Sequence, residues 1–160
     1  MGGKTSDNVR LLYVEDDPTS ARLLKAIAEK EGYAVDLATS EKECLKSVGE
    51  EPPHLFLIDL NLPDASGLDL LAKLKEKYPE VPAIIVTASD SIQDVIGAMK
   101  RGAVDYLNKP IDARRMVVSI QNALRLNRQQ QEIARLRADV SEAYSAEQLL
   151  GSSQGMDRVR

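Results

Sequence analysis

Short apolar runs alternate with amphipathic stretches along most of this sequence. Five runs have the length and composition of β-strands, at residues 9–14, 33–38, 55–59, 83–86 and 104–107. The stretches between them place apolar residues at helical spacing. Such helices are expected at residues 19–31 and 41–50, along Leu68, Leu71, Leu74 and Tyr78, and along Ile92, Val95, Ile96 and Met99. Asp112 is placed to cap a long last helix, so the pattern predicts a strand–helix unit repeated five times.

The predicted strands are those of a sheet buried on both sides. Three of them, including residues 55–58 and 83–86, are apolar throughout instead of alternating with polar residues. Such runs are typical of a parallel sheet whose two faces are both covered by helices. Right-handed crossovers then produce a doubly wound α/β sandwich. In this class the ligand site lies beyond the carboxyl ends of the strands, where the strand order reverses.

Polar side chains follow four of these strands. Glu15 and Asp16 come after the first strand, Asp59 after the third, Thr87 after the fourth and Lys109 after the fifth. Each is weak evidence alone, because an acidic pair after a strand is more often a solvated turn or a helix start. Their placement at the same ends of different strands favours a single pocket.

The residue types in this pocket suit phosphate chemistry. Oxygen ligands without His or Cys favour a hard cation, and Mg²⁺ usually takes one or two carboxylates together with phosphate oxygens. Lys109 supplies a positive charge and Thr87 a hydroxyl for other phosphate oxygens. A carboxylate can attack phosphorus to form an acyl phosphate, so Asp59 is the expected nucleophile.

Composition and charge narrow the range of possible functions and locations of the protein. The 160 residues are 43% hydrophobic and 29% charged, which is typical of a soluble globular domain, and a net charge of −4 gives no reason to expect nucleic-acid binding. The sequence has neither a membrane-spanning run nor a signal peptide, so a cytoplasmic location is expected. The single histidine, His54, argues against His-based metal sites and catalytic triads, and the single cysteine, Cys44, is expected to pack in the core.

From Val9 to about Leu126 the sequence resembles the receiver domains of two-component response regulators. The resemblance implies a flavodoxin-like sheet of strand order 2-1-3-4-5. It also implies that Asp59 accepts a phosphoryl group from a sensor histidine kinase. Asp16 and Asp59 would bind Mg²⁺ directly, Glu15 through water, and Asn61 through its backbone carbonyl. A Glu at position 15, where Asp is commoner in the family, bears only on the metal geometry.

The resemblance extends to the switch residues. Thr87 would be the switch hydroxyl, Tyr106 the switch aromatic residue and Lys109 the phosphate-pairing lysine, joined to Pro110 by a cis peptide. Phosphorylation would draw Thr87 inward, let Tyr106 rotate and remodel the face of the fourth helix, fifth strand and fifth helix. Such a domain is not an enzyme in the usual sense, since it catalyses only its own phosphorylation and dephosphorylation. Four further residues complete the match: Pro63 and Gly67 shape the loop after Asp59, and Asn61 and Ser89 tune dephosphorylation.

The chain continues beyond the receiver as an amphipathic helix. Leu126, Ile133 and Val140 lie seven residues apart and Leu136 occupies the offset position, which predicts a dimerising coiled-coil linker at 127–148. The alternative is a solvated amphipathic helix. Residues 1–8 are expected to be disordered.

The sequence pattern of the last residues differs from that of the predicted linker helix. The pattern from Gly151 through Ser153 and Met156 to Val159 resembles the entry to the ATPase domain of bacterial regulators that work with sigma factor 54. No phosphate-binding G-x-x-x-x-G-K-[ST] motif occurs in the 160 residues. The sequence is therefore expected to be a fragment of a transcription activator. Residues 149–160 would begin a truncated ATPase domain, and the DNA-binding domain would be absent.

Three other functions stay open at this point. An Asp-nucleophile phosphatase of the haloacid dehalogenase type would need a second Asp two residues after Asp59, and Asn61 stands there. A passive flavodoxin-like binding module would need a Gly-rich or Ser/Thr-rich loop after the first strand, which is missing. A stand-alone receiver would act by protein association alone.

Overall fold

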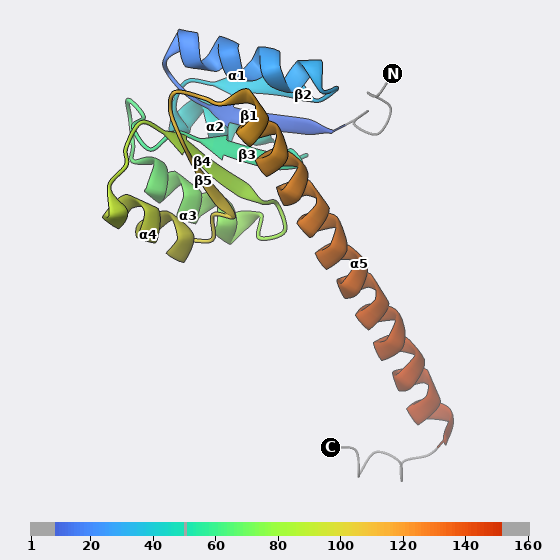
Figure 1. The fold of residues 1–160 in the computed structure, drawn as a ribbon. Helices are drawn as coiled ribbons and strands as arrows, with labels where there is room; N and C mark the ends of the chain where they lie inside the picture. Colours follow the sequence, from blue (N-terminus) through green and yellow to red (C-terminus); the bar gives the residue numbers. More distant parts are fainter. Residues whose placement is uncertain (1–8, 50, 152–160) are drawn as a thin grey trace. The chain divides into compact units, whose positions relative to one another are not determined.

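The computed structural model describes the backbone of residues 9–49 and 51–151 and the side chains of 9–49 and 51–140. The chain divides into a first compact unit that ends at Arg125 and a second that begins at Leu126. Strands and helices alternate throughout (Figure 1). The elements are β1 (Arg10–Val14), α1 (Pro18–Lys30), β2 (Ala34–Ala38), α2 (Glu41–Val48), β3 (Leu55–Ile58), α3 (Gly67–Lys77), β4 (Ala83–Thr87), α4 (Ile92–Lys100), β5 (Asp105–Asn108) and α5 (Ala113–Gly151).

All five strands form one parallel sheet of order β2-β1-β3-β4-β5, which confirms the expected fold. The register brings the ends of β1 and β3 level, because their last residues, Val14 and Ile58, pair with each other, while β4 continues past Ile85 to Thr87. The residues that follow β1 and β3 therefore emerge side by side. The strand order reverses at this same place, between β1 and β3.

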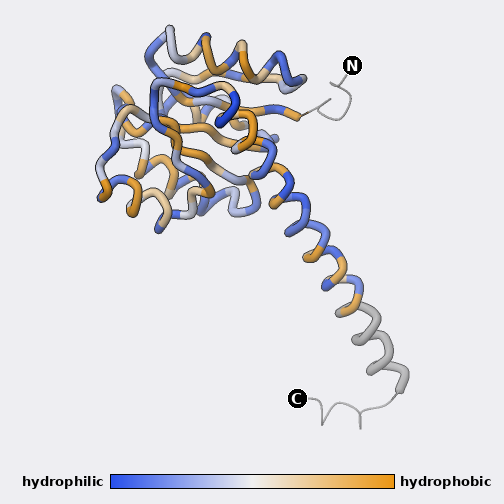
Figure 2. Tube along the Cα trace, viewed as in Figure 1, coloured by the Kyte–Doolittle hydropathy of each residue, from blue (hydrophilic) through white to orange (hydrophobic). Residues whose placement is uncertain are grey.

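Helices cover both faces of the sheet (Figure 1). On one face α1 and the first turns of α5 pack on the strands, with Leu24, Ile120 and Ala123 in the contact. On the other face lie α2, α3 and α4, and Leu71 and Leu74 of α3 are fully buried against the sheet. Figure 2 shows the hydrophobic colour concentrated on the strands. The all-apolar strands are thus explained by burial on two sides.

Helix α4 forms where the sequence predicts a helix, but its large apolar residues are exposed. The spacing of its large apolar residues suggests a buried face, yet Ile92 is 74%, Ile96 48% and Met99 46% exposed. Ala98 is the buried residue of this helix, and it belongs to the same core cluster as the buried residues of α2 and α3. A small residue lets the helix approach the sheet closely, so its larger apolar side chains are left facing outward.

Capping residues set the helix starts. Ser40, Ser66 and Ser91 each accept a hydrogen bond from a backbone N–H in the first turn of α2, α3 and α4. Helix α2 ends at Val48 instead of reaching residue 50, because Gly49 adopts a φ of 56°. Strand β5 begins and ends one residue later than expected, at Asp105 and Asn108.

The second unit is described as a continuation of α5 as far as Gly151. Among its residues with described side chains, 126–140, the large apolar ones are exposed by 47% to 67%: Leu126, Ile133, Leu136 and Val140. Ile133, Leu136, Arg137 and Val140 line a shallow depression on the helix. Within the described residues, the structure has no helix that combines the length and the apolar composition needed to span a bilayer. The expectations for residues 1–8 and 152–160 fall outside the described residues.

Cys44 is a buried core residue of α2, as the sequence indicated. Burial raises the pKa of its thiol to about 12, and the nearby Glu41 charge adds to the shift. Because the thiolate is the reactive form, we expect native protein at pH 8 to resist iodoacetamide, and protein unfolded in urea to react completely. Mass spectrometry after timed labelling checks this. Equal rates in the native and unfolded states would contradict the burial of Cys44.

Candidate functional site

Glu15 and Asp59 lie at neighbouring strand ends. The Asp59 N–H donates to the carbonyl of Val14 at 3.0 Å, and the Glu15 N–H donates to the carbonyl of Ala38 at 2.8 Å. These bonds continue the sheet ladder by one residue past β3 and β1. Both residues are buried, with Glu15 1% and Asp59 5% exposed. The fold therefore holds two carboxyl groups together in a protected position, where they need a positive partner.

Lys109 supplies that positive charge. Its Nζ lies 2.5 Å from Glu15 Oε1 and 3.1 Å from Asp59 Oδ2. Partial burial lowers the pKa of Lys109, but the bonds to the two carboxylates outweigh it, so the pKa rises above its ordinary value. The amine is consequently a cation at neutral pH. The Lys109–Pro110 peptide bond is cis, in agreement with the expectation from the sequence.

Glu15 is fixed by two further donors. The Tyr13 hydroxyl donates to Oε1 at 2.8 Å, and the Asp17 N–H donates to Oε2 at 3.1 Å. Burial raises the pKa of Glu15, while the bonds from Lys109, Asp17 and Tyr13 oppose that rise. Burial and the Glu15 charge raise the pKa of the Tyr13 phenol, which therefore remains a donor. Sequence reasoning missed Tyr13, although residues two apart on a strand share a face.

The carboxylates of Glu15, Asp16 and Asp59 form an acidic cluster. One oxygen of each lies within 4.8 Å of the others, and Asp16 is exposed to solvent. An all-oxygen, partly open set of this kind fits Mg²⁺, which binds few protein ligands and retains waters. The Asn61 N–H donates to Asp59 Oδ1 at 3.3 Å, so Asn61 is held beside the cluster. A ligand role for its carbonyl remains a prediction.

The loop after Asp59 returns closely to the strand it leaves. The Gly67 N–H donates to the carbonyl of Leu60 at 2.8 Å. A Cβ at position 67 would lie 2.2 Å from the carbonyl oxygen of Asp59, so only glycine fits here. Asp64, at the far side of the loop, accepts the N–H groups of Glu41 and Lys42 at 2.9 and 3.1 Å, at the start of α2. The hydrogen bonds of Gly67 and of Asp64 hold the two sides of the loop, and they thereby fix the position of Asp59.

Thr87 and Tyr106 lie on the neighbouring strands. Thr87 ends β4 and is fully buried, and its hydroxyl oxygen has no hydrogen-bond partner among the described residues. The Tyr106 hydroxyl donates to the backbone carbonyl of Ser89 at 2.9 Å. A buried hydroxyl without a partner is costly, so Thr87 Oγ1 is available to a ligand oxygen.

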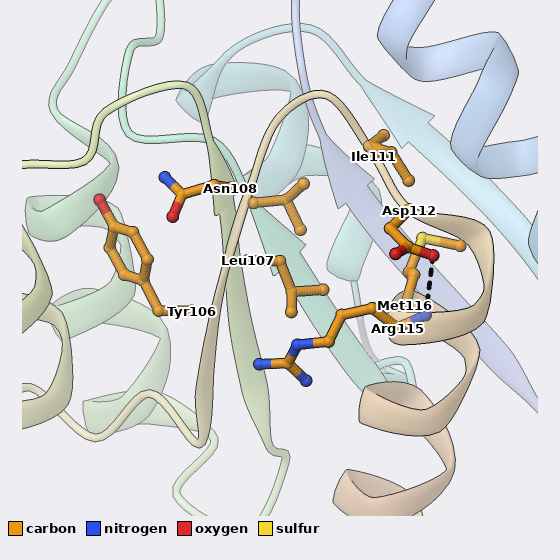
Figure 3. Close-up of a pocket in the computed structure, with 8 residues that line it drawn as sticks. Tyr106, Leu107, Asn108, Ile111, Asp112, Arg115 and Met116 are labelled. Atoms are coloured by element: carbon orange, nitrogen blue, oxygen red, sulfur yellow. Dashed lines mark hydrogen bonds between the residues drawn. The ribbon is translucent and has the colours of Figure 1, made fainter.

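A separate cavity lies between β5 and the start of α5 (Figure 3). Its volume is about 300 Å³, and Leu107, Ile111, Arg115 and Met116 are among the residues that line it. In Figure 3 the Tyr106 ring points away from these side chains. The cavity contains no member of the acidic cluster, so the two sites are distinct.

The fold and the site together define a doubly wound α/β domain with an acidic cluster at the carboxyl edge of its sheet. The response regulator receiver domain family matches residues 11–121, and this chain belongs to that family. The family assignment made from the sequence is thereby confirmed.

Individual relatives agree with this assignment. Regulatory protein LuxO of Vibrio cholerae is 35% identical over 147 residues, which cover 91% of this chain and 31% of LuxO. Transcriptional regulatory protein ZraR of Escherichia coli is 35% identical over 120 residues, covering 75% of this chain and 27% of ZraR. A CheY-like receiver domain protein from Methanospirillum hungatei has a TM-score of 0.73 at 32% identity, covering 76% of this chain and 98% of that one. The chain thus spans less than a third of the length of the two regulators.

Proposed function

We propose that this domain is a phosphorylation-dependent signalling switch. The observation that carries the proposal is the buried arrangement of Asp59, Lys109 and Glu15 beside the unpartnered hydroxyl of Thr87. An Asp59 oxygen attacks the phosphorus of a phosphohistidine on a sensor kinase. The new O–P bond forms as the P–N bond breaks, and the histidine nitrogen leaves with its electron pair.

The neighbouring residues neutralise the charge of the added phosphoryl group and change position in response to it. Lys109 Nζ already lies 3.1 Å from Asp59 Oδ2 and pairs with a phosphoryl oxygen after transfer. Thr87 Oγ1 donates to another phosphoryl oxygen and so gains the partner it lacks. Asp16 and Asp59, Glu15 through water and the carbonyl of Asn61 would hold Mg²⁺, which would supply further positive charge for the phosphoryl group. Movement of Thr87 then lets the Tyr106 side chain rotate.

We assign the regulatory effect of phosphorylation to other domains of a longer protein. We place the receiver at residues 9–126, a linker at 127–148 and the start of an ATPase domain at 149–160, in a cytoplasmic activator that works with sigma factor 54. The names of LuxO and ZraR support a regulatory role, and the chain covers 31% and 27% of these two proteins, which supports a longer protein. The chain has two exposed apolar surfaces for a homodimer. One consists of Ile92, Ile96 and Met99 of α4. The other, called the apolar seam, consists of Leu126, Ile133, Leu136 and Val140 of the second unit. DNA binding is assigned to a domain outside this chain.

Replacing Lys109 by Met should destabilise the domain by about 2 kcal/mol at low salt, because Glu15 and Asp59 lose their shared charged donor. Millimolar Mg²⁺ should restore part of this loss, since the cation neutralises the same carboxylates. Urea unfolding with Mg²⁺ and with EDTA measures both effects. Lys46→Met is the matched control, because Lys46 is an exposed residue of α2 and its replacement should cost less than about 0.5 kcal/mol. An equal loss with and without Mg²⁺ would count against the metal site.

Leu136→Asp should weaken dimerisation at least tenfold, because the substitution puts a charge in the apolar seam with Ile133 and Val140. Ala134→Asp adds the same charge to the same helix away from the seam, and it should leave the dimer nearly unchanged. Sedimentation equilibrium at several protein concentrations distinguishes the two variants. If both variants matched the unmodified chain, the linker would be a solvated helix.

A further inference from the structure

The backbone carbonyl of Ser89, in the loop between β4 and α4, accepts two hydrogen bonds from β5. The Tyr106 hydroxyl donates at 2.9 Å and the Asn108 side-chain amide donates at 2.7 Å. A carbonyl oxygen has two lone pairs, so both bonds form together. Tyr106 and Asn108 lie two positions apart on one strand, and their side chains therefore project on the same side of the sheet.

Ser89 also connects this loop to α4. Its hydroxyl donates to Asp94 Oδ2 at 2.6 Å and accepts the N–H of Ser91 at 3.3 Å. Two residues before Ser89 stands Thr87, whose register partner on β5 is Asn108. Ser89 is therefore the point where β5, the first turn of α4 and the segment that carries the Thr87 hydroxyl are held together.

We propose that Asn108 is a positioning residue for Thr87. It acts by donating a hydrogen bond to the Ser89 carbonyl, to which Tyr106 also donates. Any loop movement that carries Thr87 toward Asp59 has to take Ser89 with it or break both bonds. Loss of the Tyr106 hydroxyl alone leaves the loop held through Asn108. The functional meaning rests on the proposed function, in which Thr87 contacts the phosphoryl group. The holding role itself requires no phosphorylation.

Local hydrogen exchange of the unphosphorylated full chain tests the holding role. Asn108→Leu keeps the side-chain size but removes the donor, and it should speed amide exchange at residues 88–91 about fivefold, the effect of losing one hydrogen bond. Tyr106→Phe should have a similar effect, and the double variant should speed exchange more than either single variant, because the Ser89 carbonyl then has neither donor. Amides of α1 that exchange by local opening should keep their rates, and the unfolding equilibrium in urea should change by no more than the same factor of about five.

Asn122→Leu, at an exposed position of α5, is the control and should leave residues 88–91 unaffected. The proposal is overturned if Asn108→Leu leaves exchange at 88–91 unchanged. It is also overturned if amides that exchange by local opening elsewhere, such as those of α1, accelerate equally, since that would be a general effect on the domain.

Beryllofluoride, a mimic of the phosphoryl group, separates this inference from the proposed function. In the Asn108→Leu variant, we expect an altered beryllofluoride-induced shift of the Thr87 amide resonance relative to the unmodified chain. An identical shift in both proteins would refute the link from Asn108 to Thr87. If beryllofluoride shifts nothing in the unmodified chain while exchange at 88–91 still responds to Asn108→Leu, the proposed function fails and the holding role stands.

Discussion

Replacing Asp59 by Asn should abolish phosphoryl uptake from a small acyl-phosphate donor in the presence of Mg²⁺. The amide has no negative charge and is a poor nucleophile toward phosphorus. The domain should still fold, because Asn has nearly the same shape and Lys109 retains its bond to Glu15. Intact mass spectrometry after timed incubation measures the uptake. We expect a loss of at least a thousandfold in rate.

Asp69→Asn provides the matched control for this prediction. It makes the same chemical change at an exposed residue in the first turn of α3. Uptake by this variant should equal that of the unmodified chain. Phosphorylation of Asp59→Asn at a comparable rate would show that another residue accepts the group, and the assignment of Asp59 would be wrong.

Gly67→Ala should destabilise the domain by about 3 kcal/mol and slow phosphoryl uptake. The new Cβ would meet the Asp59 carbonyl oxygen at 2.2 Å and Leu60 Cα at 2.6 Å, and both atoms belong to the backbone. Because backbone cannot swing aside as a side chain can, the junction of β3 with the loop has to shift. Asp59 is then displaced from Lys109. Urea unfolding and the uptake assay measure the two effects.

Gly97→Ala separates this clash from the general effect of adding a methyl group. Its Cβ would meet Leu68 Cδ1 at 3.2 Å and Arg101 Nη1 at 3.3 Å, which are the ends of flexible side chains. Alanine also favours the helix by about 1 kcal/mol over glycine. Gly97→Ala should therefore change stability by less than about 1 kcal/mol. Similar losses in both variants would contradict the close approach at Gly67.

The fold was predictable because its local signals agree with one another. Apolar strands, Ser-capped helices and short connections all indicate a doubly wound sheet, and the strand order came from the family resemblance. Helix α4 shows the limit of periodicity. Apolar spacing identifies Ile92, Ile96 and Met99 as one face, but it carries no information about what lies opposite. The structure buries Ala98 and leaves that face exposed.

The site was predictable where strand ends determine it and unpredictable where side chains meet by packing. Parallel strands bring Glu15, Asp59 and Lys109 to one edge, so their proximity follows from the topology. The Tyr13 bond to Glu15 follows from spacing on one strand and could have been found. The Asn108 bond to Ser89 depends on the path of the loop between β4 and α4, which no sequence pattern determines.

The most direct test of the central proposal is to locate the phosphoryl group on the unmodified chain. The protein is incubated with Mg²⁺ and acetyl phosphate, its intact mass is measured, and the modified residue is identified by peptide mass spectrometry. We predict one added phosphoryl group, on Asp59, and none when EDTA removes the metal. If neither acetyl phosphate nor a phosphorylated sensor kinase adds a group, and beryllofluoride leaves the Thr87 and Tyr106 resonances unchanged, the domain is not a phosphorylation switch.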